Sequence, residues 1–261
     1  MPKIEFDLLP SGAGGFCLAL LTLLVAWPAA TPAQTAPEIP AYARVNTFGI
    51  FSAFSNDSSH ILMGMAERRK LVEVGASYGR RLYLNHIVNW QFNAELLPVA
   101  LEADPLGRVI IRQTSPIVLT SVQAIGPPIT CAPVTTRYNE TLPNGVILAG
   151  TETVYCHGRE WTIGEGMSPI GFQWNFRPSH PLQPFLIGHG GYMYSTRPIP
   201  VPFAGSFNFT FDIGAGLELY RSKSRSVRAE YRFHHISNHD TANYNPGIDN
   251  GVLQITYAFG R

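Results

Sequence analysis

The sequence predicts an all-β fold: an eight-stranded antiparallel transmembrane β-barrel with a long extracellular insertion between its third and fourth strands. Three observations predict it. Apolar and polar residues alternate with the two-residue period of strands, eight segments do so, and the connections between them alternate between long and short. No stretch after residue 30 is apolar for the roughly 20 residues that a membrane helix needs. A chain that crosses a membrane without helices must close its strands into a barrel, because lipid satisfies no backbone polar groups.

The composition limits the partners of the chain. Its 19 basic and 18 acidic residues nearly cancel, so it carries no basic field for nucleic acid, and no nucleic-acid partner is expected. Charged residues make up 14% of the chain and aromatic residues 11%. For a soluble enzyme this content of charged residues is low and this content of aromatic residues is high, which favours a membrane-embedded protein.

Residues 1–33 have the pattern of a secretory signal peptide. An apolar core, Phe16–Trp27, is too short for a comfortable membrane span, and a run of small residues follows it. Cleavage is expected after Ala33 rather than after Ala36, which is followed by proline. The alternative is an uncleaved anchor. Cleavage would remove Cys17 and leave residues 34–261 as the mature barrel.

The clearest strand runs from Phe207 to Tyr220. Its odd positions are uniformly apolar, and its even positions are mostly polar or glycine. A soluble sandwich also alternates, but seven unbroken apolar positions opposite Asp, Glu and Gly suit a lipid-facing wall around a narrow polar interior. The eight predicted strands are residues 43–54, 68–79, 82–96, 169–177, 183–194, 207–220, 226–237 and 250–260.

The predicted connections alternate in length. The short ones are 79–81, 178–182 and 221–225, and the long ones are 55–67, 97–168, 195–206 and 238–249. Outer-membrane barrels place short turns in the periplasm and long loops outside the cell. Residues 97–168 are too long for a simple loop and are interpreted as an extracellular insertion of unassigned role.

Two cysteines remain in the mature chain, and both lie in this insertion. In an oxidising compartment Cys131 and Cys156 are expected to form a disulfide, although two separate thiols remain the alternative. His157 stands beside Cys156, but no spacing of metal ligands accompanies it. The sequence therefore predicts no metal site and no cofactor.

The last two strands and their loop bring together the residue types of a hydrolase triad. A serine, a histidine and a carboxylate can serve as nucleophile, base and orienting acid. Counting by twos from the apolar face of residues 226–237 gives His235 and Ser237, and counting back along residues 250–260 gives Asp249. If the strands extend this far, all three lie on the outer wall at the extracellular rim. The neighbouring His234 is expected inside the barrel, near Glu230.

The hairpin from Tyr231 to Asp249, with His-x-Ser-Asn and an acid twelve residues after the serine, resembles the lipid A 3-O-deacylase family. The resemblance covers residues 165–261 well and the first three strands loosely. It implies an eight-stranded outer-membrane barrel that hydrolyses the ester-linked acyl chain at the 3-position of lipid A. Members of this family are carboxylic ester hydrolases, and the resemblance places the chain in the Gram-negative outer membrane as a multi-pass protein.

Carried over by position, Ser237 is the nucleophile, His235 the general base and Asp249 the acid. The family commonly has Glu at the acid position, and Asp is one methylene shorter. A side-chain amide of Asn238 or Asn245 is expected to donate to the oxyanion, with Asn245 preferred. Both asparagines also fit a purely turn-forming role.

The expected partner is lipid A of lipopolysaccharide in the outer leaflet. Whether the barrel forms a homodimer is left open by the sequence. Two other interpretations remain: a non-catalytic surface barrel, such as an adhesin or structural protein, and a soluble lipid-binding barrel in the periplasm. The aromatic outer wall speaks against the soluble barrel.

Overall fold

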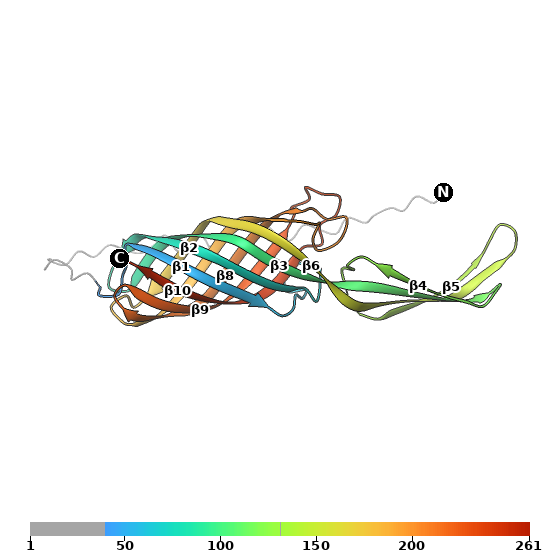
Figure 1. Ribbon diagram of the computed structural model, residues 1–261, viewed down its shortest axis with the longest axis horizontal. Helices are drawn as coiled ribbons and strands as arrows, with labels where there is room; N and C mark the ends of the chain where they lie inside the picture. Colours follow the sequence, from blue (N-terminus) through green and yellow to red (C-terminus); the bar gives the residue numbers. More distant parts are fainter. Residues whose placement is uncertain (1–39, 131) are drawn as a thin grey trace, which may run out of the picture. The chain divides into compact units, whose positions relative to one another are not determined.

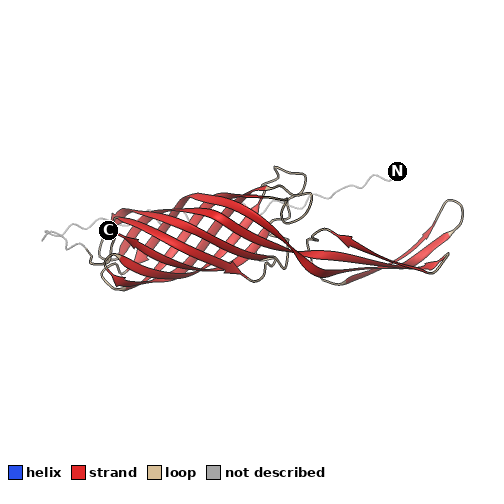
Figure 2. Cartoon of the chain, in the orientation of Figure 1, coloured by secondary structure: helices blue, strands red, loops and turns tan. Residues whose placement is uncertain are grey.

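The computed structural model describes residues 40–130 and 132–261. The predicted signal peptide and Cys131 lie outside the described residues. Within the described ranges no helix is long and apolar enough to cross a membrane. The described chain is built from strands and loops (Figures 1 and 2). The strands are β1 (Asn46–Ser55), β2 (Lys70–Leu84), β3 (Val88–Ser115), β4 (Leu119–Ile125), β5 (Val134–Thr141), β6 (Ile147–Phe176), β7 (Leu182–Ser195), β8 (Phe207–Ser222), β9 (Arg225–Ser237) and β10 (Ile248–Gly260).

Eight of these strands close into the predicted antiparallel barrel. Neighbours along the chain pair with one another, β1 pairs with β10, and β3 pairs directly with β6 across the segment that holds β4 and β5. The ring therefore has the order β1-β2-β3-β6-β7-β8-β9-β10, with no free edge among its eight members. Closure satisfies the backbone polar groups that an open edge would leave in lipid.

The predicted alternation within the strands is confirmed. In β8 the odd positions from Phe207 to Leu219 are exposed on the outer wall, while Asn208, Thr210, Asp212 and Glu218 are buried inside. Aromatic side chains gather on the outer wall towards both ends: Trp90 stacks on Trp174 near the short-turn end, and Tyr192 on Phe207 near the long-loop end. Such paired girdles flank the apolar band of outer-membrane barrels.

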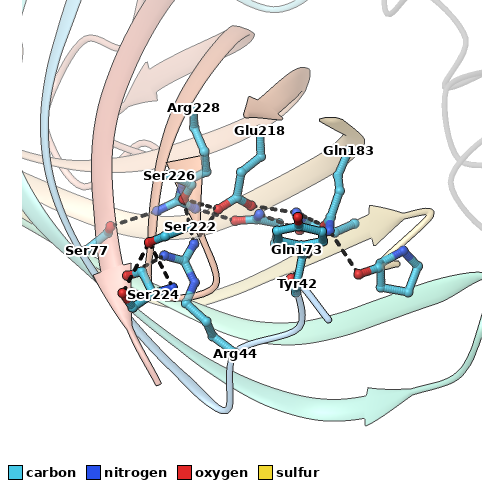
Figure 3. A network of polar contacts seen from close by, with 12 residues as sticks. Tyr42, Arg44, Ser77, Gln173, Gln183, Glu218, Ser222, Ser224, Ser226 and Arg228 are labelled. Atoms are coloured by element: carbon cyan, nitrogen blue, oxygen red, sulfur yellow. Dashed lines mark hydrogen bonds and ion pairs between the residues drawn. The ribbon is translucent and has the colours of Figure 1, made fainter. Parts of the chain in front are cut away.

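The interior is filled by polar side chains that bind one another (Figure 3). Arg44 donates to Glu218 and, at 2.6 Å, to the hydroxyl of Ser226. Arg228 donates to Gln173 at 2.6 Å and to Ser77 at 3.3 Å, so the network spans the lumen from β2 to β6 and β9. Burial of charge is tolerated because partners of opposite sign or matching hydrogen-bond type surround it.

An apolar cluster covers this polar interior at the long-loop end. Its members are buried residues of the loops and of the adjoining strand ends: Ala66, Ala100, Met193, Ile199, Ile236 and Ile248. The cluster joins the β1–β2 loop and the β7–β8 loop to strands β3, β7, β9 and β10, so these loops are packed onto the barrel. A packed rim holds the adjacent outer-wall residues in a defined place.

The predicted ends of the third and fourth barrel strands, 96 and 169, are wrong. Pairing of β3 with β6 continues to Ser115 and Ala149, so most of residues 97–168 belongs to these two strands. The pairing of β2 with β3 reaches Ala103 of β3, and the pairing of β7 with β6 reaches Gly164 of β6. Beyond these two residues β4 pairs with β3, and β5 pairs with β6 (Figure 1). The alternation is interrupted by register shifts between Leu97 and Ala100 and again further on, which conceals the strand in the sequence.

The short turn predicted at residues 79–81 is also wrong. Gly79 and Arg80 lie in β2, opposite Asn93 and Phe92 of β3. The turn falls at residues 85–87 instead, where the side-chain oxygen of Asn85 accepts the backbone N–H groups of Ile87 and Val88 at 2.8 and 2.7 Å. An asparagine side chain can form a turn without glycine. The prediction instead relied on Gly79 as a turn residue, and therefore placed the turn too early.

Cys156 lies in β6 opposite Gly107 of β3. Because Cys131 lies outside the described residues, the disulfide between them stays a prediction.

Candidate functional site

The triad residues lie where β9 and β10 meet the long-loop end of the barrel. Asp249 stands directly opposite His235 in the ladder, and Ser237 is the last residue of β9. In β9 the outward positions continue without interruption from Tyr231 through Phe233 to His235 and Ser237, because the strand keeps its alternation to its end. All three predicted residues therefore share the outer face.

His235 and Asp249 are in contact. The distance between His235 Nδ1 and Asp249 Oδ1 is 2.6 Å, and the imidazole lies nearly parallel to the ring of Phe233. The histidine side chain is 13% exposed and the carboxylate is fully buried. A buried carboxylate on Nδ1 fixes the ring and leaves Nε2 as the nitrogen that can take a proton.

Asp249 is held from its other side by the β1–β2 loop, residues 56–69. Its Oδ2 accepts the backbone N–H of Leu62 at 2.7 Å and that of Met63 at 2.8 Å. These two donors, together with the imidazole, stabilise the negative charge of the carboxylate. The sequence analysis did not identify this loop as part of the site, since backbone donors depend on no residue type.

Ser237 is half-buried at the end of β9. Its Oγ accepts the backbone N–H of His239 at 3.1 Å. The hydrogen bonds of the described residues include none between Ser237 and His235. Because residues two apart on a strand are separated by roughly 7 Å, the two side chains lie on one face within reach of the same small group.

The two asparagines have different surroundings. Asn238 is buried, and its side chain bonds to the carbonyl of Tyr244 at 2.8 Å and to the N–H of Asp240 at 3.0 Å. Asn245 uses its side-chain oxygen to accept the backbone N–H of Asn238 at 3.1 Å. Asn238 therefore shapes the loop, while Asn245 keeps an NH₂ group that can donate to an anion beside Ser237.

His234 points into the barrel as expected, but its partner is Asp212 and not Glu230. The distance between His234 Nδ1 and Asp212 Oδ1 is 2.5 Å. Glu230 instead accepts a hydrogen bond from Arg232 at 2.6 Å. Among the described residues, no three His, Cys, Asp or Glu side chains are grouped so that they could hold a metal ion.

The profile of the family described as lipid A 3-O-deacylase (PagL) matches residues 136–258, which include β9, the loop that follows it and β10 as far as Ala258. The resemblance to the lipid A 3-O-deacylase family is confirmed. The closed barrel with an apolar outer wall and a polar lumen is that of a Gram-negative outer-membrane protein.

Two solved structures are similar to the chain. The crystal structure of the outer membrane enzyme PagL is 13% identical, with a TM-score of 0.47, and the match covers 80% of this chain and 97% of that one. The crystal structure of Neisserial surface protein A is 11% identical, with a TM-score of 0.41, and the match covers 83% of this chain and 97% of that one. No curated protein matches the chain.

Proposed function

We propose that the chain is a serine esterase that removes the ester-linked acyl chain at the 3-position of lipid A. The observation that carries this proposal is the pairing of His235 with the buried Asp249 on the outer wall, one outward position from Ser237. A cluster of polar groups on a lipid-facing wall costs free energy. Its presence there therefore indicates a functional role. The match to the deacylase family supplies the reaction.

In the proposed reaction Ser237 Oγ attacks the ester carbonyl, and His235 Nε2 takes its proton. Asp249 stabilises the imidazolium that forms, and the NH₂ group of Asn245 donates to the oxyanion. When the tetrahedral intermediate collapses, the imidazolium returns the proton to the departing sugar oxygen. A water molecule, deprotonated by His235, then attacks the acyl-serine, and the imidazolium returns the proton to Ser237 Oγ as the fatty acid leaves. The serine–histidine contact closes when substrate binds, because catalytic hydrogen bonds are often long in the free enzyme.

The orientation of the strands suits an acyl chain. Outward-facing residues paired across the sheet form rows that begin near the long-loop end of β1 and finish near the short-turn end of β2. One such row is Phe54, Leu253, Tyr231, Ala215, Leu186, Trp174, Trp90 and Tyr83. With long loops outside the cell, rows followed from β9 towards β8, β7 and β6 descend into the membrane.

The row that starts at Ser237 follows this descending direction. It continues through Phe209, Tyr192 and Met167 to Leu96, all of them directly paired. Three strand spacings separate β9 from β6, a distance of about 14 Å. An open hollow of about 330 Å³ lies at the end of the row, lined by Leu96, Met167 and Tyr192 among others. An acyl chain whose ester lies at Ser237 can therefore follow an apolar path downwards.

The proposal is tested on lipid A extracted from cells that express the wild type or Ser237→Ala. We expect the mass of lipid A to fall by one hydroxyacyl unit with the wild type only. Unchanged lipid A in both strains would contradict the proposal.

The lengthened β3–β6 pair favours a second candidate, a non-catalytic surface barrel that binds a partner. β4 and β5 are almost wholly exposed on the two sides of this pair, and such a sheet offers a surface with no use in ester hydrolysis. Identical lipid A from both strains is the result that this candidate predicts.

A further inference from the structure

The β1–β2 loop folds over the acid of the proposed triad along its whole middle part. Besides the two bonds to the carboxylate, the N–H of Ser59 donates to the backbone carbonyl of Asp249 at 3.2 Å. Met65 and Ala66 donate to the carbonyls of Pro246 and Gly247 at 2.7 and 3.1 Å. The loop is thus bonded to residues 246–249 as an additional short strand would be.

The approach of the loop to Asp249 requires a glycine. A Cβ added at Gly64 would lie 2.4 Å from the backbone nitrogen of Asp249 and 2.9 Å from its carboxylate carbon. Backbone and a buried carboxylate cannot shift easily, so any larger residue must lift the loop. Gly247, opposite, has φ of +59°, and a Cβ there would lie 3.2 Å from His235 Cε1.

The base of the loop is fastened by one buried arginine. Arg69 is fully buried and donates to Asp104 at 2.9 Å. It also donates to the carbonyls of Glu67, Pro128, Ile129 and Pro200, at distances between 2.5 and 3.0 Å. These contacts join the loop to the β4–β5 and β7–β8 connections, so the end of the loop that leads into β2 is fixed.

The middle of the loop carries large apolar side chains that are exposed beside the site. The exposed fractions are 47% for Ile61, 69% for Leu62, 55% for Met63 and 49% for Met65. Four such side chains in five residues are unfavourable in water and favourable against hydrocarbon. The same residues whose N–H groups hold Asp249 thus present their side chains to whatever lies on the wall.

We propose that the β1–β2 loop is a lipid-contacting clamp. Its backbone fixes Asp249, and the side chains of Ile61, Leu62, Met63 and Met65 bind the acyl chains of the lipid whose ester lies at Ser237. One segment then both contacts the lipid and aligns the acid. This inference rests on the proposed function and adds the element that holds both the acid and the substrate.

The first experiment tests the backbone contact through Gly64→Ala, measured with lipid A in vesicles. We expect kcat to fall about 100-fold with little change in KM, because the loop is lifted from the acid. The double variant with Asp249→Asn should be no more than about twofold worse than Asp249→Asn alone, since both changes act through one carboxylate. A wild-type kcat in Gly64→Ala would overturn the clamp. A loss of kcat in the double variant equal to the product of the two single losses would also overturn it.

The second experiment replaces exposed side chains and keeps the backbone, so it does not depend on whether Gly64→Ala folds. Leu62→Ser with Met63→Ser should raise KM for lipid A in vesicles about tenfold or more, as expected when two apolar side chains no longer contact lipid. The matched control is Ile117→Ser with Val118→Ser, another exposed apolar pair, in the β3–β4 turn, which should leave KM unchanged.

Failure of the clamp is distinguishable from failure of the proposed function. If the wild type leaves lipid A intact, the esterase itself is refuted. If the wild type is active and the Leu62–Met63 double variant keeps its KM, only the clamp is refuted.

Discussion

Two adjacent histidines of β9 each bind an aspartate, on opposite sides of one sheet. His234 meets Asp212 inside the barrel at 2.5 Å, and His235 meets Asp249 on the outer wall at 2.6 Å. The inner pair is sealed among other charged groups, with Arg232 and Glu73 close by. The outer pair has one partly exposed member and a serine two residues further along the same face.

Strand parity thus places the same chemical pair in two different surroundings. Inside, a histidine and an aspartate neutralise each other in a lumen too narrow for substrate, and they stabilise the fold. Outside, the pair lies on the outer wall near Ser237, which is the nucleophile of the proposed reaction. Substitutions at the two pairs should therefore differ in their effects on turnover and on stability.

Replacement of Ser237 or His235 by alanine should have the largest effect. Each should lower kcat for deacylation about 10⁴-fold or more, and the double variant should be little worse, because nucleophile and base act as one unit. The measurement is single-variant and double-variant kinetics on lipid A in vesicles. More than a few per cent of wild-type activity in Ser237→Ala, or abolition of wild-type activity by a chelator, would contradict these roles.

Asp249→Ala should cost less, about 10³-fold in kcat, because the carboxylate orients the imidazole and does not touch the substrate. Asp249→Glu keeps the charge and should retain activity within about tenfold of the wild type. Steady-state kinetics of the two variants checks both values. A wild-type kcat in Asp249→Ala would show that the carboxylate has no part in the reaction.

Asn245→Ala should lower kcat about 100-fold with KM little changed, as loss of an oxyanion donor does. Asn238→Ala, by contrast, removes the two side-chain bonds that shape the loop and should lower thermal stability as well. Kinetics and thermal unfolding in detergent, measured on both variants, distinguish the two. An Asn245→Ala variant with wild-type kcat would remove it from the site.

Asp212→Asn should have the smallest effect on turnover, within about twofold of the wild type. It should nevertheless lower the free energy of unfolding by about 3 kcal/mol, because it leaves a buried histidine without its charged partner. Denaturant unfolding in detergent measures the second quantity. A loss of turnover comparable to that of Asp249→Ala would show that the inner pair is also part of the catalytic machinery.

The sequence predicted well wherever a strand has one apolar and one polar face. β8 and β9 begin and end within two residues of the predicted limits, and the outward positions of His235 and Ser237 follow from the same count. It failed where a bulge interrupts the count, as between Leu97 and Ala100, and where a side chain makes the turn, as Asn85 does.

The alternation of apolar and polar residues is enough to predict the barrel, its polar lumen and the face on which each residue of the proposed triad lies, because strand geometry assigns faces by parity. What surrounds these residues depends on contacts between distant parts of the chain. That Asp249 faces His235 follows from the register of β9 with β10. That Leu62 and Met63 hold its other oxygen follows from a loop nearly 190 residues away, whose backbone donors leave no mark in the amino-acid code.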